Sequence, residues 1–312
     1  MRTRLCLLFI CGTVWTLHGA AQQARYRSTT EAVLVDVAVT SGGTPVTGLT
    51  ARNFELKDMD VKQQIEIVSF ADVPISLLLV LDVSSSVTGD RLSQLKDAAG
   101  AAVDALRPGD QAALLTIRDR VTLEIGWTSD RTALRRHIDG MVARGWTALH
   151  DAVFSAIAFR EDAVGRVLIL IFSDGADTAS WLDARRVIEA ARQSDVVITA
   201  VSAMQRARPT GGREARDFFG LDANLRRWFE RDPTLFPYAF LQAIAGETGG
   251  TLLHVSNDKE IASAFENTVA AFKTRYLLTY TPEGVDRPGW HPISVRLVGR
   301  RGEVTARRGY WR

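Results

Sequence analysis

Five oxygen-bearing side chains stand at positions where they could act together. Asp82, Ser84 and Ser86 lie in "LDVSSS", directly after a continuous apolar run. Asp174 lies in "FSDG", after a second apolar run, and Thr147 lies in "GWTALHDA". The set offers two carboxylates and three hydroxyls, with no imidazole or thiolate. Such a shell suits a hard divalent cation, and its few charged groups favour Mg²⁺ or Mn²⁺ over a dedicated Ca²⁺ cage.

Each of these residues also has a simpler interpretation when it is taken alone. Ser, Thr and Asp are common N-caps of helices, so an isolated Ser86 or Thr147 is more often a cap than a ligand. The joint spacing, with one aspartate after each of two apolar runs, favours metal binding over five separate caps.

The elements that must position these side chains are alternating strands and helices. "ISLLLVLD" and "RVLILIF" are continuous apolar runs of strand length, as in strands buried on both faces of a sheet. Helical patterns of apolar residues lie between such runs. This alternation predicts an α/β fold with a doubly wound, mainly parallel sheet over residues 74–272, similar to a Rossmann-like domain.

In doubly wound sheets, ligands bind beyond the carboxyl ends of the strands, where the strand order reverses. Asp82 and Asp174 would face each other there if their two strands are neighbours. Two carboxylates so close would repel each other unless a cation lies between them.

Both flanks of this region have β-like sequences. Residues 28–72 include the alternating "AVLVDVAV", and residues 275–312 return to strand patterns with turn signals. We expect the two flanks to pair into a small β-domain, because pairing covers sheet edges. Residues 204–236 interrupt the α/β alternation as an insertion, and its arginines and aromatic residues could influence the choice of partner.

Residues 1–21 have the features of an export signal. A positive start with Arg2 and Arg4 precedes the short apolar run "LCLLFICGTVWTL" and the small residues of "HGAAQQ". That run is shorter than the roughly 20 apolar residues of a membrane span, and no later stretch is longer, so we expect no transmembrane span in the mature chain. We expect a periplasmic, cell-surface or extracellular protein; an uncleaved N-terminal anchor is the alternative.

Composition excludes several other classes of function. The only cysteines, Cys6 and Cys11, lie in the predicted signal, so the mature chain has neither a disulfide nor a thiol nucleophile. The formal net charge of the 312 residues is only +2. The basic end "RLVGRRGEVTARRGYWR" alternates with apolar residues, as charged edge strands do, and we expect no nucleic-acid partner.

Asp-x-Ser-x-Ser after the first buried strand, a distant Thr and the Asp of "FSDG" resemble the metal-ion-dependent adhesion site (MIDAS) of von Willebrand factor type A (VWA) domains. All five positions of that motif are filled here, and the resemblance covers nearly two-thirds of the chain. The flanks "VDVAVTSGGTPVTGLTARNFEL" and "YLLTYTPEG" are similar to those of exported bacterial proteins of the acidobacterial type with a related domain. "KDMDVKQQ" departs from that pattern, because it lacks the glycine expected in its turn.

The resemblance implies a metal-dependent protein-binding or adhesion function without catalysis. In such domains the protein coordinates the cation incompletely, and an Asp or Glu carboxylate of a protein partner completes the shell. Two alternatives stay open. One is a Mg²⁺-dependent phosphoryl transferase or other hydrolase, although Ser84 stands where aspartyl phosphatases of the haloacid dehalogenase kind have a second acid. The other is a metal-independent scaffold.

Overall fold

A computed structural model of the protein describes residues 32–68, 73–202 and 237–312. The predicted export signal (1–21) and the predicted insertion (204–236) both lie outside the described residues.

The centre of the fold is a six-stranded sheet with the strand order β11-β10-β9-β6-β7-β8. Its strands are β6 (Ile75–Asp82), β7 (Gln111–Ile117), β8 (Val121–Thr128), β9 (Arg166–Phe172), β10 (Val197–Ser202) and β11 (Leu252–His254). Neighbouring strands are parallel, except that β8 runs antiparallel to β7 at one edge. The prediction of a doubly wound, mainly parallel α/β sheet is therefore confirmed.

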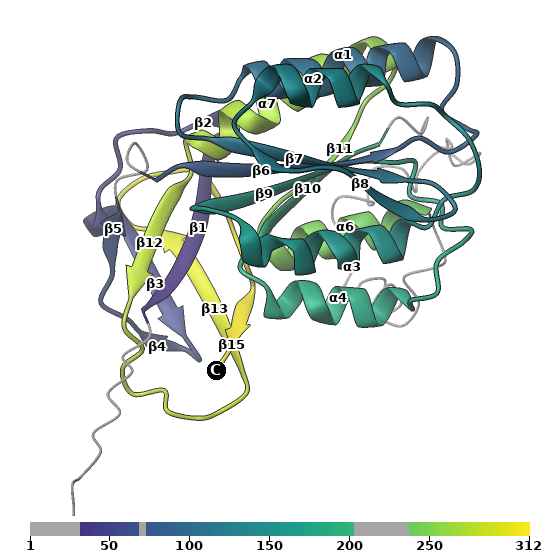
Figure 1. Ribbon diagram of the computed structural model, residues 1–312. Helices are drawn as coiled ribbons and strands as arrows, with labels where there is room; N and C mark the ends of the chain where they lie inside the picture. Colours follow the sequence, from purple (N-terminus) through teal and green to yellow (C-terminus); the bar gives the residue numbers. More distant parts are fainter. Residues whose placement is uncertain (1–31, 69–72, 203–236) are drawn as a thin grey trace, which may run out of the picture. The chain divides into compact units, whose positions relative to one another are not determined.

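Helices cover both faces of this sheet (Figure 1). One face is covered by α1 (Asp90–Asp104), α2 (Arg131–Asp139) and α7 (Ile261–Lys273), and the other by α3 (Leu149–Phe159), α4 (Ala184–Gln193) and α6 (Pro237–Thr248). The strand β6 supplies both cores, because Leu77 and Leu79 pack on the first face while Leu78 and Val80 pack on the second. Successive side chains of a strand alternate between faces, so a strand covered on both sides is apolar throughout.

The strand order reverses between β6 and β9, which are neighbours at the centre of the sheet. The chain passes from β6 through α1 to β7 on one side, and later enters β9 on the other side. Leu81 is paired with Phe172, so the next residues, Asp82 at the end of β6 and Ser173 after β9, lie together at the carboxyl edge of the sheet. The condition stated above for Asp82 and Asp174, that their two strands are neighbours, is met.

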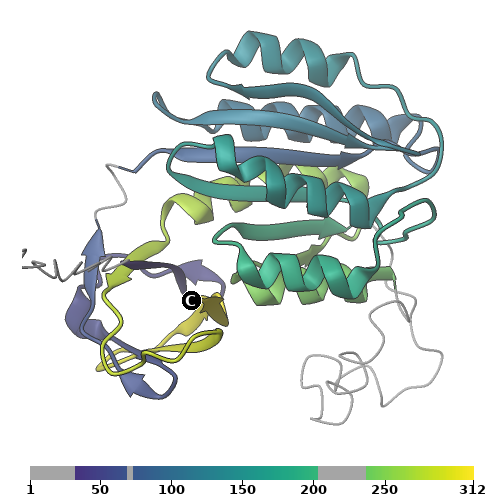
Figure 2. The same ribbon diagram turned by 60° about the horizontal axis from the view of Figure 1, so that its bottom comes forward.

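Strands from the two flanks pair with each other in two antiparallel sheets (Figure 2). In the first, β1 (Val33–Ser41) lies between β12 (Tyr276–Tyr280) and β14 (Glu303–Ala306). In the second, β3 (Phe54–Asp58) pairs with β13 (Trp290–Leu297). The remaining strands are β2 (Thr44–Pro45), β4 (Val61–Lys62), β5 (Glu66–Val68) and β15 (Gly309–Trp311), and short 3-10 helices occupy Ala51–Asn53, Arg160–Asp162 and Asp258–Glu260. Alternate valines of β1 are buried between the sheets, as their period predicts.

The turn between β3 and β4 keeps a left-handed backbone without glycine. Met59 and Asp60 have φ angles of 47° and 67°. This is the region that glycine adopts most easily, so the departure noted in "KDMDVKQQ" falls on the turn itself.

Among the helices of the described ranges, none is both long and apolar enough to span a bilayer.

Candidate functional site

Asp82 is the last residue of β6, and its side chain is buried, with 1% of the residue exposed. Its Oδ1 accepts a hydrogen bond of 2.9 Å from the backbone N–H of Ser84, and its Oδ2 accepts one of 3.0 Å from the Ser173 hydroxyl. Burial raises the pKa of Asp82 above its ordinary value, and the neighbouring charge of Asp174 adds to this rise, although both serines oppose it. A cation at this edge of the sheet would relieve the penalty on the ionised carboxylate.

The hydroxyl oxygens of Ser84 and Ser86 lie 3.0 Å apart in the loop that follows β6. Ser84 is buried and Ser86 is exposed, so the pair runs from the sheet edge to the surface. Adjacent ligands of an octahedral Mg²⁺ with bonds of about 2.1 Å are about 3 Å apart. The two hydroxyls therefore have the separation of neighbouring ligands of one small cation.

Asp174 is partly exposed in the loop that follows β9. Its Oδ1 accepts a hydrogen bond of 2.9 Å from the N–H of Ala176, which folds the loop around its side chain. The charge of Asp174 is close enough to raise the pKa of Asp82, so both carboxylates belong to one electrostatic site.

Thr147 is buried in the loop before α3, and this loop is tied to the one that carries Asp174. The N–H of Thr147 donates to Thr178 Oγ1 at 3.0 Å, and its carbonyl oxygen accepts from Thr178 N and Ala179 N at 2.9 and 3.1 Å. The backbone of Thr147 is thus held against the segment that follows β9.

The same loop is also tied to the residues that follow Asp82. Arg144 N donates to Val83 O at 2.9 Å, and Ser85 N donates to Gly145 O at 3.0 Å. These backbone bonds flank Ser84 on both sides. The five residues proposed as ligands therefore come from the end of β6 and from three loops that are hydrogen-bonded to one another at one edge of the sheet.

Several residues that the sequence did not single out support these loops. Ser173 joins the two strand ends through Asp82. Asp177 Oδ1 accepts from Leu149 N at 2.8 Å and so caps the start of α3, and Asp119 Oδ1 accepts from Trp146 N at 2.6 Å. Ser173 and Asp177 stand next to Asp174 in "FSDGADT", but their partners lie far away in the chain. Such long-range capping leaves no local spacing pattern to detect.

The donor set defines what the site could hold. In the part of the chain that the structure describes, no three His, Cys, Asp or Glu side chains form a metal cluster. A cation here would depend on hydroxyls together with two carboxylates, which is an all-oxygen set suited to a hard divalent ion.

Two exposed tryptophans lie in the segments that carry Thr147 and Asp174. Trp146 directly precedes Thr147 and is 68% exposed, and Trp181, in the segment between β9 and α4, is 96% exposed. Large exposed aromatic side chains next to a polar site are typical of binding surfaces.

Residues 77–176 match the von Willebrand factor type A domain. Among curated proteins, inter-alpha-trypsin inhibitor heavy chain H4 of Bos taurus is 24% identical over 207 residues, which cover 62% of this chain and 20% of the relative. UPF0353 protein MAV335 of Mycobacterium avium is 24% identical over 206 residues, covering 61% of this chain and 58% of the relative. The matched part is thus less than two-thirds of the length of either relative.

Among solved structures, a von Willebrand factor type A protein from Catenulispora acidiphila is similar with a TM-score of 0.53. The match covers 88% of this chain and 76% of that chain at 12% sequence identity. At this identity, the likeness shows the fold.

Proposed function

Since residues 77–176 match the von Willebrand factor type A domain, we propose that this chain is an exported, non-enzymatic protein that binds a protein partner through one divalent cation. The export part of this proposal rests on the sequence of residues 1–21 alone.

In this proposal, Asp82 and Asp174 supply the negative charge, directly or through water. The three hydroxyls, from Ser84, Ser86 and Thr147, complete the protein side of the shell. The cation is Mg²⁺ or Mn²⁺, and an Asp or Glu carboxylate of the partner supplies the missing ligand. The 3.0 Å separation of the two serine hydroxyls, beside a buried aspartate at the point where the strand order reverses, carries the proposal.

The surroundings of the site support binding to a protein. Trp146 and Trp181 offer large exposed apolar surfaces close to the loops of Thr147 and Asp174. Tryptophan is enriched among the residues that dominate the energy of protein interfaces. A partner that places its carboxylate on the cation would bury part of these side chains.

The residue two positions after Asp82 is unfavourable for the alternative of phosphoryl transfer. Aspartyl phosphatases of the haloacid dehalogenase kind have a second acid there, and this chain has Ser84. Asp82 is also buried, with 1% of the residue exposed, whereas a nucleophilic aspartate must reach its substrate. We therefore favour a role in cation binding over a role as nucleophile.

Calorimetric titration of the mature protein with Mg²⁺ and with Mn²⁺ tests the proposal. We expect one saturable site, with affinity lost in Ser86→Ala and in Asp174→Ala. Ser85→Ala is the matched control, because Ser85 is exposed in the same loop and only its backbone N–H is bonded to Gly145. A folded wild type that binds neither ion, alone or with a carboxylate peptide, would contradict the proposal.

A further inference from the structure

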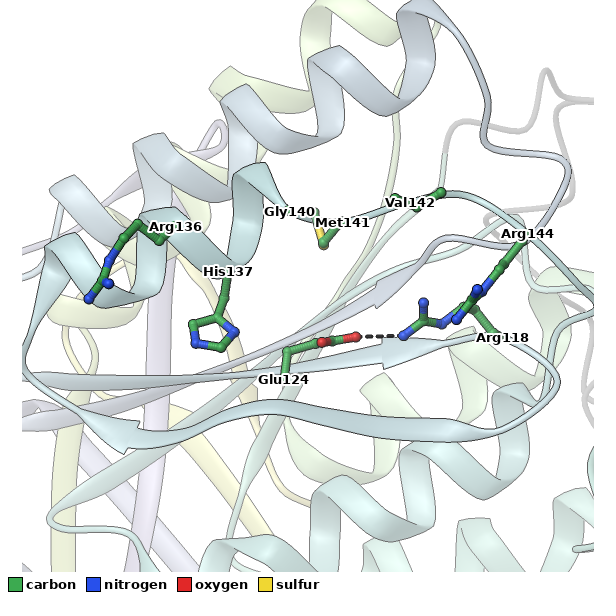
Figure 3. A pocket seen from close by; sticks show the side chains of 8 residues that line it. All are labelled: Arg118, Glu124, Arg136, His137, Gly140, Met141, Val142 and Arg144. Atoms are coloured by element: carbon green, nitrogen blue, oxygen red, sulfur yellow. Dashed lines mark hydrogen bonds and ion pairs between the residues drawn. The ribbon is translucent and has the colours of Figure 1, made fainter.

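A basic pocket opens beside the candidate metal site, between the end of α2 and the strands β7 and β8 (Figure 3). Its volume is about 330 Å³. The ionisable side chains that line it are Arg118, Glu124, Arg136, His137 and Arg144, and we name it the Arg144 pocket.

The positive charge of this pocket is only partly neutralised. Arg118 Nη2 lies 2.6 Å from Glu124 Oε1 and also donates to Thr116 Oγ1 at 3.0 Å. Arg144 lines the same pocket, and Figure 3 labels it on the same side of the view as Arg118. Arg144 is exposed, and within residues 32–68, 73–202 and 237–312 its side chain has no hydrogen bond or ion pair. Glu124 can balance one of these two guanidinium groups, which leaves a positive charge in the pocket.

The Arg144 pocket and the candidate metal site share one loop. Arg144 N is bonded to the carbonyl of Val83, the residue between Asp82 and Ser84. Arg144 also precedes Thr147 by three residues, so their Cα atoms are at most about 11 Å apart. At the other end of the loop, Ala148 N donates to Arg118 O at 3.0 Å. Both arginines are therefore fixed by backbone bonds to the segment that carries a proposed ligand.

We propose that the Arg144 pocket is a second subsite, which receives a further carboxylate from the same protein partner. The first carboxylate, on the cation, rests on the function proposed above; the second is bound by the guanidinium groups of Arg144 and Arg118. The partner segment is then an acidic peptide with at least two Asp or Glu residues a few positions apart.

The chemistry of the pocket fits a carboxylate on a peptide. A guanidinium group is planar and donates two parallel hydrogen bonds that match the two oxygens of a carboxylate. Nucleic acids are instead bound by basic tracks that follow many phosphates. This site is one pocket in a chain with a formal net charge of +2, and Glu124 lies within it.

Peptide titrations with two probes test this subsite. The first probe is hexaglutamate with blocked ends, and the second is the same peptide with one glutamate and five glutamines. We expect Arg144→Gln to weaken hexaglutamate binding in saturating Mg²⁺ about tenfold, as for the loss of one charge-assisted pair. Binding of Mg²⁺ and of the single-glutamate peptide should not change. Arg300→Gln is the matched control, because Arg300 is an exposed arginine between β13 and β14.

The results test the subsite and the metal site separately. An equal preference for hexaglutamate in wild type and Arg144→Gln would overturn the subsite even if Mg²⁺ binds. Absent Mg²⁺ binding would overturn the metal site, while hexaglutamate binding in chelator that is lost in Arg144→Gln would still support the subsite. A thymidine hexanucleotide bound as tightly as hexaglutamate would overturn the assignment to an acidic protein segment.

Discussion

The Ser173 hydroxyl donates a hydrogen bond of 3.0 Å to Asp82 Oδ2 and so links the ends of β6 and β9. Both residues are buried, at 0% and 1% exposure. The same hydroxyl oxygen accepts a hydrogen bond of 3.1 Å from the N–H of Gly175, in the loop that carries Asp174. One small side chain therefore fixes the position of a carboxylate on one strand end and the path of the loop on the other.

Ser173→Ala should lower the free energy of unfolding more than substitution of an exposed serine does. The change leaves Asp82 Oδ2 and Gly175 N without a partner in a buried place, which costs about 1–3 kcal/mol of the free energy of unfolding. Urea denaturation measures the loss. Ser263→Ala is the control, because its exposed hydroxyl bonds only to Glu260 O, and we expect a change below about 0.5 kcal/mol. If the two substitutions lower the free energy of unfolding equally, the Asp82–Ser173 hydrogen bond contributes no more to stability than an exposed one.

Asp82→Asn should make the metal-free protein more stable near neutral pH. Burial raises the pKa of Asp82, so the folded state disfavours the ionised carboxylate relative to the unfolded chain. This penalty is absent below the unfolded pKa of about 3.9, grows between that value and the higher folded pKa, and stays constant above the folded pKa. In chelator, Asp82→Asn should therefore unfold at a higher temperature than wild type at neutral pH, and the gap should close near pH 4.

Divalent cation should reverse that order of stability. Mg²⁺ at one hundred times its Kd stabilises a protein that binds it only when folded by about 2.7 kcal/mol. Wild type should show this gain, and Asp82→Asn should not, because the amide is neutral. Thermal unfolding with and without Mg²⁺ measures both effects. A gain of the same size in the variant would exclude Asp82 as a charged ligand.

The sequence predicted those parts of the site that depend on local patterns. "ISLLLVLD" and "RVLILIF" could be recognised as doubly buried strands because the two cores need apolar side chains on both faces of β6 and β9. Asp82 and Asp174 follow those strands directly, so their place at the sheet edge could be inferred. Their joint role as ligands stays a prediction.

The remaining parts depend on contacts between distant segments. Asp119 accepts a hydrogen bond from Trp146 N, 27 residues away, and Asp177 accepts one from Leu149 N, 28 residues away. No spacing in the sequence indicates contacts over such separations. The Arg144 pocket arises because the end of α2 lies near β7 and β8, and its arginines come from three segments: Arg118 follows β7, Arg136 lies in α2, and Arg144 follows α2. In the flanks, the alternation of apolar residues predicted strand β1, but nothing in the sequence predicted the register that pairs Val35 with Leu278.

Gly145→Ala should displace the loop that carries Thr147. Gly145 has a φ of 77°, and an added Cβ would lie 2.4 Å from Asp119 Oδ2, whose carboxylate accepts from Trp146 N. Left-handed strain alone costs roughly 1–2 kcal/mol, and the clash adds to it. We expect a larger loss of unfolding free energy than for Gly299→Ala, together with weaker Mg²⁺ binding.

Gly299 is a matched control for this glycine. Its φ is 68°, but an added Cβ meets nothing within 4 Å, so the control has the backbone strain without the clash. Chemical denaturation and Mg²⁺ titration of both variants separate the two effects. If both variants lose equal stability and retain full affinity for Mg²⁺, close packing of Asp119 against Gly145 does not hold the Thr147 loop.

A buried tyrosine pair predicts how the fold responds to alkaline pH. Tyr280 and Tyr310 both donate to Asp58 Oδ2, at 3.0 and 2.8 Å, in the core between the two flank sheets. Burial is the main cause that raises the pKa of each phenol, and the negative charge of Asp58 raises it further. A phenolate there would be poorly solvated and would repel the carboxylate, so the folded state keeps both protons.

Because the folded pKa values are raised, these tyrosines stabilise the fold fully below the unfolded pKa of about 10, and this contribution is lost as the pH rises above it. The free energy of unfolding in urea should therefore fall between about pH 9 and pH 11, and fall less steeply in Tyr280→Phe. That variant should also lose about 1 kcal/mol at neutral pH through its missing hydrogen bond. Ultraviolet absorbance of the phenolates provides a second measurement. Reversible ionisation of all five tyrosines of the chain before the near-ultraviolet circular dichroism changes would contradict this account.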